Sequence, residues 1–132
     1  MKDSWDPTCP FCLRVREGRI EAGDPLSALF PDENPLTPGH RLVIPRRHVS
    51  DYFRLTEKEK RSVWTMVDDA KRPIDAETKP AGYNLGVNVG AAAGQTIPHV
   101  HVHVIPRYSG DRDDPRGGVR WVIPERARYW ET

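Results

Sequence analysis

Three histidines alternate with valines in the stretch His99–Ile105. On an extended strand, successive side chains point to opposite faces, so the histidines share one face, roughly 7 Å apart, and the valines share the other. Val and Ile at this period favour a strand over a helix, and the valine face is expected to join the core. A row of imidazoles is costly to bury without partners and titrates near neutral pH, which indicates a chemical role.

A second reactive group is the pair Cys9 and Cys12, the only cysteines in the chain. A disulfide framework is not expected from one close pair in a chain that shows no secretion signal. A thioredoxin-like redox pair needs a strand before it and a helix after it, whereas residues 13–20 are predicted to form a hairpin. Two interpretations remain, half of a zinc site completed by ligands from elsewhere, and free inert thiols.

Composition limits the class of protein. A chain of 132 residues suffices for one domain with a core and is too short for two ordinary domains. The 20 Lys and Arg residues against 19 Asp and Glu leave a net charge of +1, which favours a small-molecule partner over nucleic acid or a membrane. Neither a membrane span of ~20 apolar residues nor a basic start followed by an apolar run is visible, so a cytoplasmic location is expected.

Short strands are expected to position these residues. They are predicted over Ser27–Phe30 and His40–Ile44, each ended by the proline that follows, and over Tyr83–Val89. The small-residue loop Gly90–Thr96 then leads directly into the histidines. Small residues let the backbone approach a ligand closely, and free N–H groups in such a loop can cradle a phosphate.

One long helix is expected between these strands. Thr56 and Glu59 form a capping box, in which each side chain accepts a hydrogen bond from an opening N–H group. The helix is predicted to run to about Arg72 and to stop at Pro73, and residues 75–81 are predicted to be a loop.

Residues 108–132 form a C-terminal tail that is rich in aromatic and basic side chains, among them Arg116, Arg120, Trp121 and Trp130. The aromatic content indicates that the tail docks on its own domain or on a second subunit. Because guanidinium groups suit phosphate, we expect the segment from residue 113 onward to pack near the histidine strand.

With these residues assembled, the chain resembles the histidine triad (HIT) superfamily of nucleotide hydrolases and transferases. The signature His-φ-His-φ-His-φ-φ, where φ is hydrophobic, is matched in full by His99–Ile105. The segment Pro38–His40 before a strand and the segment Ala93–Thr96 directly upstream of the histidines support the match, which covers about residues 9–107.

Two features bear on the branch of the superfamily. The spacing from Asn88 to His103, followed by Pro106 and Arg107, is most similar to the Fhit-like dinucleoside polyphosphate hydrolases. The cysteine pair is instead similar to bacterial members and to the galactose-1-phosphate uridylyltransferase relatives.

The resemblance implies an α+β fold, with an antiparallel sheet of about five strands and one long helix packed on it. We therefore expect a single HIT domain over residues 1–132. Residues 108–132 lie outside the shared pattern and are expected, from their aromatic content, to form a tail docked on the domain or on a dimer partner. Family members usually form homodimers, so a homodimer is expected.

The resemblance also assigns catalytic roles. His101 matches the nucleophile, which attacks the α-phosphate of a nucleoside phosphate derivative and forms a nucleotidyl-histidine that water then cleaves. A neutral imidazole nitrogen is a good nucleophile at pH 7, which agrees with this role. His103 matches the residue that hydrogen-bonds the scissile phosphate and can protonate the leaving group, and His40 matches a supporting histidine. No cofactor is required for this chemical step.

The substrate-binding positions implied are Asp32 for the ribose, Gln95 and Thr96 for the phosphates, and Asn88. A dinucleoside polyphosphate such as diadenosine tetraphosphate is the favoured substrate, with a purine base expected. Hydrolysis of an adenosine phosphoramidate and nucleotidyl transfer are alternatives within the superfamily. A nucleotide-binding protein with little turnover is an alternative outside enzymes, because a fold does not guarantee activity.

A structural zinc is implied as well. In relatives that carry Cys-x-x-Cys, the first histidine of the triad and a histidine from a Pro-x-x-His segment complete the site. The corresponding residues here are Cys9, Cys12, His48 and His99, a closed Cys₂His₂ set. A catalytic zinc held by the three triad histidines is the competing interpretation, since His-x-His pairs on a strand can bind such a metal.

Overall fold

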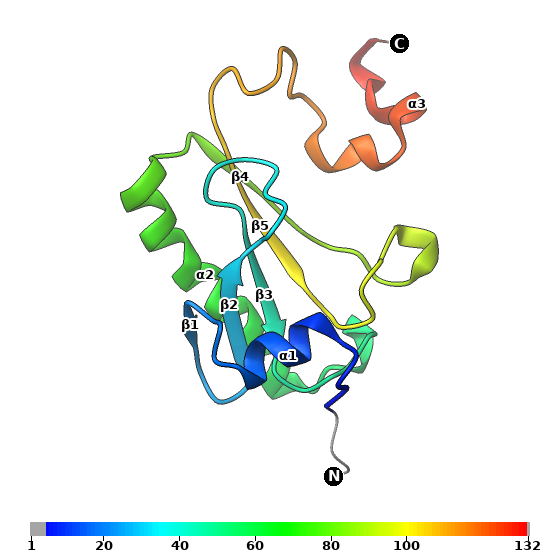
Figure 1. Ribbon diagram of the computed structural model, residues 1–132. Coiled ribbons are helices and arrows are strands. Elements are labelled where there is room, and N and C mark those ends of the chain that lie inside the picture. Colours follow the sequence, from blue (N-terminus) through cyan, green and yellow to red (C-terminus); the bar gives the residue numbers. More distant parts are fainter. Residues whose placement is uncertain (1–4, 132) are drawn as a thin grey trace.

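A five-stranded antiparallel sheet, in the order β1-β2-β3-β5-β4, forms the centre of the computed structural model, which describes residues 5–131 (Figure 1). Its strands are β1 (Ala22–Gly23), β2 (Ser27–Pro31), β3 (Arg41–Pro45), β4 (Gly82–Val87) and β5 (Val102–Arg107). The predicted α+β class is therefore confirmed, and the three strands expected from the prolines and the alternation are present. Residues 1–4, on which the expected lack of a signal partly rests, and residue 132 of the tail lie outside the described part.

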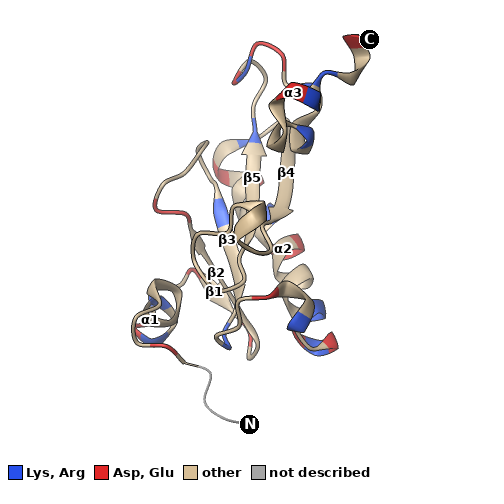
Figure 2. Ribbon diagram, turned by 90° about the vertical axis from the view of Figure 1, so that its right-hand side faces the viewer, with Lys and Arg blue, Asp and Glu red and all other residues tan. Residues whose placement is uncertain are grey.

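One face of the sheet is covered by helix α2 (Glu57–Thr78), as predicted (Figure 2). Its N-terminus has the expected capping box, in which the Thr56 hydroxyl accepts from the Glu59 N–H and the Glu59 carboxylate accepts from the Thr56 N–H. The helix side chains Val63, Met66, Val67, Ala70 and Ile74 pack against Leu29, Val43, Val102 and Val104 of the sheet.

The predicted end of this helix at Arg72 is wrong, since α2 continues through Pro73 to Thr78. Pro73 removes one hydrogen bond, and proline in a helix interior costs about 3 kcal/mol. Ile74 is fully buried in the next turn, which contributes ~1.5–3 kcal/mol by apolar burial. Asp75 in the same turn accepts a hydrogen bond from the Tyr83 hydroxyl at 2.6 Å. Tertiary contacts therefore hold the last turn where the local sequence favours a stop.

The opposite face of the sheet is covered at one end by a second helix, α1 (Pro10–Arg16), where a hairpin over residues 13–20 was expected (Figure 2). That prediction is wrong. Cys9 caps the helix, because its Sγ accepts from the Cys12 N–H at 3.4 Å, and proline at the first helical position is already set for a helical φ. Phe11 and Cys12 then face inward and join Ala28, Phe30, Leu42 and Ile44 in a second apolar cluster.

The histidine segment becomes a strand later than expected, because β5 begins at Val102 rather than at His99. The neighbouring strand β3 ends at Pro45, whose carbonyl accepts from the His99 ring Nε2 at 2.8 Å. A side-chain hydrogen bond therefore takes the place of further strand pairing. The alternation persists nonetheless, and the valines at 100, 102 and 104 are each at most 1% exposed.

The tail beyond β5 folds into short helical turns at the end of the sheet away from the N-terminus (Figure 1). They are η3 (Gly118–Val122), α3 (Pro124–Ala127) and η4 (Tyr129–Glu131), and two further 3-10 turns elsewhere are η1 (Tyr52–Arg54) and η2 (Ala91–Ala93). Within residues 5–131, no helix combines the length and the apolar character needed to cross a membrane.

Candidate active site and metal centre

A cavity of about 470 Å³ lies on the α1 side of the sheet and collects most of the predicted site. Apolar side chains of Phe11, Phe30 and Leu42 line it together with His101 and His103. Four further predicted residues also line it, namely Asp32, His40, Asn88 and Thr96. An apolar cavity of this size with a few convergent polar groups is typical of a small-molecule site.

One ring nitrogen of His101 is fixed by the backbone. The Nδ1 lies 2.8 Å from the carbonyl oxygen of His99, and a carbonyl can only accept, so Nδ1 carries the proton. In the neutral ring, the lone pair is therefore on Nε2. The His101 ring is 7% exposed and contacts the rings of Phe11 and His103 at centroid distances of 5.1 and 5.3 Å. This arrangement presents an unprotonated nitrogen in a walled cavity, which is the form a nucleophile requires.

His103 and His40 are linked into one hydrogen-bonded chain. The backbone N–H of Leu36 donates to His40 Nδ1 at 3.0 Å, so the proton of His40 is on Nε2. That nitrogen lies 3.0 Å from His103 Nδ1, which accepts, and 3.3 Å from an Asp32 carboxylate oxygen. By elimination, the proton of His103 is on Nε2, where it can be donated to a ligand.

Burial keeps these two rings neutral. Desolvation, with a smaller contribution from the neighbouring His101 and His40, lowers the pKa of His103 to about 4. Desolvation also lowers the pKa of His40, although Asp32 opposes the shift. The rings therefore act at neutral pH as hydrogen-bond donors with defined tautomers.

Gln95 is the predicted binding residue that the structure does not bring to the cavity. Its amide oxygen accepts from the Gly90 N–H at 2.8 Å, and its amide nitrogen donates to the carbonyls of Ser50 and Ile97 at 2.9 and 3.1 Å. These bonds close the small-residue loop before the histidines. Asp32 is also more engaged than expected, because its second oxygen accepts from the Asn34 N–H at 2.8 Å.

The predicted metal ligands form a tight cluster beside the cavity. In Cys9, Cys12, His48 and His99, one ligand atom of each lies within 4.8 Å of the others. The Cys12 sulfur lies 3.3 Å from His48 Nδ1 and 3.6 Å from His99 Nδ1, and the Cys9 sulfur lies 3.4 Å from His99 Nδ1. The two histidine Nδ1 atoms are 3.3 Å apart. A tetrahedral zinc with ordinary bond lengths requires edges of about 3.6 Å between sulfur and nitrogen and about 3.3 Å between nitrogens.

The surroundings also suit a cation. Donation of the His99 Nε2 proton to Pro45 leaves the Nδ1 lone pair directed at the two cysteines. Burial lowers the pKa of His99 to about 4, and it raises the pKa of Cys12 to about 11. A thiolate therefore needs a positive partner in this place, and His99, whose pKa is lowered, does not supply it at neutral pH. The cluster can hold a metal.

The competing catalytic zinc is not supported by this geometry. Among residues 5–131, the side chains that could share a metal fall into the cysteine cluster and a group of Asp32, His40 and His103. Neither group contains all three triad histidines, since His99 faces the cysteines and His101 is bonded to the backbone.

Sequence reasoning missed the apolar wall of the cavity. Phe11 lies between the two cysteines in the sequence, and its ring contacts both His99 and His101, at centroid distances of 5.8 and 5.1 Å. Arg14, on the next turn of α1, also lines the cavity. Both residues depend on α1 being a helix, so the expected hairpin concealed them.

A family model described as the HIT domain matches residues 17–110. The chain belongs to the HIT domain family. The match spans strands β1 to β5, the long helix and all three triad histidines, so the resemblance inferred from the sequence is confirmed.

Two relatives of this chain have names that state an enzyme activity. A Mycobacterium tuberculosis protein named "AP-4-A phosphorylase" is 36% identical over 132 residues, covering 95% of this chain and 67% of that protein. A Schizosaccharomyces pombe protein named "Bis(5'-nucleosyl)-tetraphosphatase [asymmetrical]" is 43% identical over 86 residues, 65% of this chain and 47% of that protein. The chain thus spans between about half and two thirds of these relatives.

A solved structure of this family bears on the metal cluster. It is described as a Zn-bound histidine triad family protein from Mycobacterium smegmatis, and it is 30% identical with a TM-score of 0.74. The superposition covers 81% of this chain and 80% of that one, which supports the HIT fold of the sheet and helices.

Proposed function

We propose that this HIT domain hydrolyses a dinucleoside polyphosphate, with diadenosine tetraphosphate favoured, through a nucleotidyl group carried on His101. The observation that carries the proposal is the hydrogen bond from His101 Nδ1 to the His99 carbonyl, which leaves Nε2 unprotonated in the cavity. The names of the two enzyme relatives support the class of substrate.

In the first step, His101 Nε2 attacks the α-phosphorus, a nitrogen–phosphorus bond forms, and the bond to the bridging oxygen breaks. The leaving nucleotide takes the bonding electron pair, and His103 donates its Nε2 proton to the leaving oxygen. The contact of His103 Nδ1 with His40 supports this tautomer. In the second step, water attacks the same phosphorus, the nitrogen–phosphorus bond breaks, and its electron pair returns to His101 Nε2. The proton that the water loses replaces the one that His103 gave to the leaving group. Donors aimed at the phosphate oxygens stabilise the charge that develops, which is commonly a large catalytic contribution.

The apolar lining of the cavity supports a purine base. Phe11, Phe30 and Leu42 line the same cavity as Asp32 and the histidines, so apolar surface for a base lies beside polar groups suited to a ribose and a phosphate. Asn88 and Thr96 remain our proposed phosphate or ribose contacts, and Gln95 contributes by holding the loop shape.

We propose that the metal in the cysteine cluster is zinc and that its role is structural. Four protein ligands leave no open position for substrate, which is the rule for structural zinc. When bound, zinc supplies charge compensation for the two thiolates and a link between α1 and the loops that carry His48 and His99. No bond-making step passes through it.

Phosphorolysis is the second candidate, favoured by the mycobacterial relative named as a phosphorylase. Inorganic phosphate would replace water as the acceptor in the second step, and everything before it would be the same. The first step is therefore common to the two reactions.

The test is a substrate panel run with and without inorganic phosphate, together with acid-sensitive trapping of α-labelled nucleotide on the protein. Diadenosine tetraphosphate should be cleaved, and label should be trapped on the wild type. His101→Ala should lose the label and at least ~10³-fold in turnover, as expected for a missing nucleophile. Turnover that needs phosphate would indicate phosphorolysis. Equal trapping in a folded His101→Ala protein would exclude His101 as the nucleophile, and tight binding without products would favour a binding protein.

A further inference from the structure

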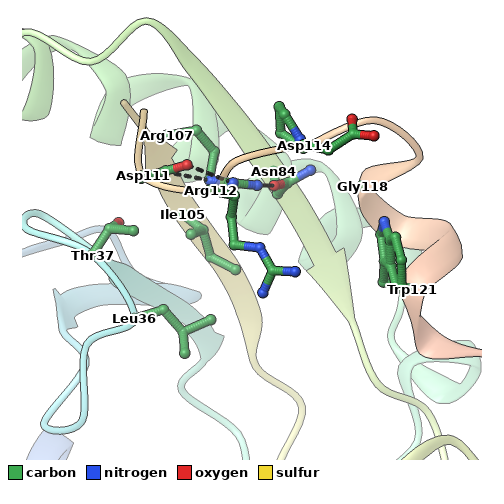
Figure 3. Close-up of a pocket in the computed structure, with 11 residues that line it drawn as sticks. Leu36, Thr37, Asn84, Ile105, Arg107, Asp111, Arg112, Asp114, Gly118 and Trp121 are labelled. Atoms are coloured by element: carbon green, nitrogen blue, oxygen red, sulfur yellow. Dashed lines mark hydrogen bonds and ion pairs between the residues drawn. The ribbon is translucent and has the colours of Figure 1, made fainter. Parts of the chain in front are cut away.

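A second cavity, of about 590 Å³, lies between the C-terminal tail and the end of the sheet where β5 finishes (Figure 3). We call it the tail pocket. Asn84 of β4 and Ile105 and Arg107 of β5 line its sheet side, and Arg112 and Trp121 line its tail side. No predicted catalytic, substrate-binding or metal residue is among those that line it.

The acidic groups of the tail pocket are already neutralised by arginines. Arg107 holds Asp111 through two hydrogen bonds of 2.8 Å and also donates to the Asn84 amide oxygen at 2.7 Å. Asp114 is held by Arg116 at 3.0 Å, and this contact lowers the pKa of Asp114 to about 2. Neither carboxylate is available to repel or to bind a ligand without losing a partner.

Arg112 is the exception among the charges of the pocket. Within residues 5–131 its guanidinium forms no ion pair and no hydrogen bond, although Asp111 and Asp114 line the same pocket. Figure 3 shows this guanidinium extending into the space between Leu36 and Trp121. The pocket therefore carries one uncompensated positive charge beside an aromatic ring.

The tail pocket continues from the active-site cavity along the same face of the sheet. His103, Ile105 and Arg107 alternate on β5, so their side chains point to one face, about 6.6 Å apart from one to the next. Leu36 lines both cavities, and on β4 Gly86 pairs with His103 and leaves open space where a side chain would stand. A ligand held at His101 and His103 can thus extend toward Arg112.

We propose that the tail pocket holds the leaving nucleotide of a dinucleoside polyphosphate, with Arg112 on its phosphates and the Trp121 ring against its base. This inference rests on the proposed function and narrows it to substrates whose leaving group is itself a nucleotide. Guanidinium groups bind phosphate oxygens with good geometry, and indole rings stack on bases without selecting one base strictly. A phosphoramidate, whose leaving group is a single amine, gains nothing from this pocket.

Binding of a non-hydrolysable methylene analogue of diadenosine tetraphosphate tests the inference without turnover. Calorimetry should give wild-type protein a clearly lower Kd for the analogue than for AMP. Arg112→Ala should raise the Kd of the analogue about tenfold, the loss of one charged hydrogen bond, and leave the Kd of AMP unchanged. Trp121→Ala should act in the same direction. Arg126→Ala is the matched control, because it removes the same charge from the tail outside the pocket.

Failure of the inference is distinguishable from failure of the proposed function. If the wild type binds the analogue no better than AMP, or if Arg112→Ala and Arg126→Ala behave alike, the tail pocket does not hold the leaving nucleotide. If inorganic phosphate alone displaces the analogue and Trp121→Ala has no effect, the pocket is a phosphate site and the assignment to a nucleotide is wrong. Absence of labelled nucleotide on wild-type protein, with these binding differences intact, would contradict only the proposed reaction.

Discussion

Two backbone groups define the chemistry of the cavity at the scale of single residues. The carbonyl of His99 holds the proton of His101 on Nδ1, and the N–H of Leu36 holds the proton of His40 on Nε2. Because His40 Nε2 donates to His103 Nδ1 at 3.0 Å, the proton of the neutral His103 ring is on its Nε2. Backbone groups do not titrate, so these assignments hold over the whole pH range in which the rings stay neutral.

The low pKa of His103 predicts a pH dependence of stability. Its folded pKa of about 4 lies below the ordinary value of 6.5 because the ring is largely buried, so between these values the unfolded chain binds a proton that the folded chain does not. The free energy of unfolding should therefore fall as pH drops from 6.5 toward 4, at up to about 1.4 kcal/mol per pH unit from this one group.

Urea unfolding of wild type and His103→Gln at several values of pH, at equal metal content, checks this prediction. The variant should lose less stability than the wild type over the same interval, because glutamine does not titrate. Parallel pH curves for the two proteins would show that His103 has an ordinary pKa in the folded state.

At the scale of elements, helix α1 joins the metal cluster to the cavity. Cys9 caps the helix, Cys12 lies in its first turn, and Phe11 between them forms a wall of the cavity. Cys9 is therefore the N-cap of α1 and also one of the four proposed metal ligands, and a single substitution can separate these two roles.

The substitution Cys9→Ser separates the two roles, because serine is a good N-cap but its hydroxyl binds zinc much more weakly than a thiolate does. We expect wild-type protein to carry about one zinc per chain, as a closed four-ligand site implies, and the variant to carry much less. The melting temperature should fall by several degrees in the variant, whereas activity per folded molecule should fall much less. A chelator should lower the melting temperature of the wild type only. A wild type purified without metal would contradict the zinc proposal.

Substitution of Pro73 is expected to raise stability, whereas Cys9→Ser is expected to lower it. Pro73→Ala restores a hydrogen-bond donor in the interior of α2, so the free energy of unfolding should rise by about 1–3 kcal/mol. Chemical denaturation measures this, with Arg72→Ala as the neighbouring control, expected within ~0.5 kcal/mol of wild type. An unchanged stability in Pro73→Ala would contradict the expected gain from the restored hydrogen bond.

Sequence patterns predicted the elements whose local and tertiary preferences agree. The capping box at Thr56 and the alternation around Val102 are local signals that the core reinforces. Where the two preferences conflict, prediction failed. Pro73 signals a stop that the burial of Ile74 overrides, and the helix α1 is set by a thiol cap that composition does not reveal. Cys9 lies beside His99, which is 90 positions away in the sequence. This contact was predicted from the family resemblance, because residue spacing alone does not indicate it.

At the scale of the whole molecule, the tail adds surface that the HIT family match does not include. The match ends at residue 110, and the tail beyond it is held together by guanidinium–aromatic contacts. Val119, Val122 and Ile123 remain more than half exposed there, as does Tyr129. The predicted homodimer and cytoplasmic location stay predictions, and light scattering on the intact chain is the measurement for the first.

Deletion of residues 113–132 tests the tail as a unit. Because Trp121 is lost and Arg112 becomes the last residue, KM for diadenosine tetraphosphate should rise about tenfold or more, while the first-step chemistry at His101 continues. Kinetics of a soluble truncated protein on diadenosine tetraphosphate and on adenosine phosphoramidate give the comparison. Unchanged KM for both substrates would restrict the tail to covering apolar surface.

The shared wall formed by α1 has a thermodynamic consequence. Phe11 contacts the His101 ring, and the two cysteines that flank it in the same helix segment, Cys9 and Cys12, meet His99 and His48. A ligand that binds only when α1 is folded stabilises the folded helix, and with it the wall of the cavity that the helix forms. Thermodynamic linkage then requires that a ligand of the cavity stabilises the metal cluster in the same way. We therefore expect that a metal in the cluster and a nucleotide in the cavity would each raise the affinity of the protein for the other.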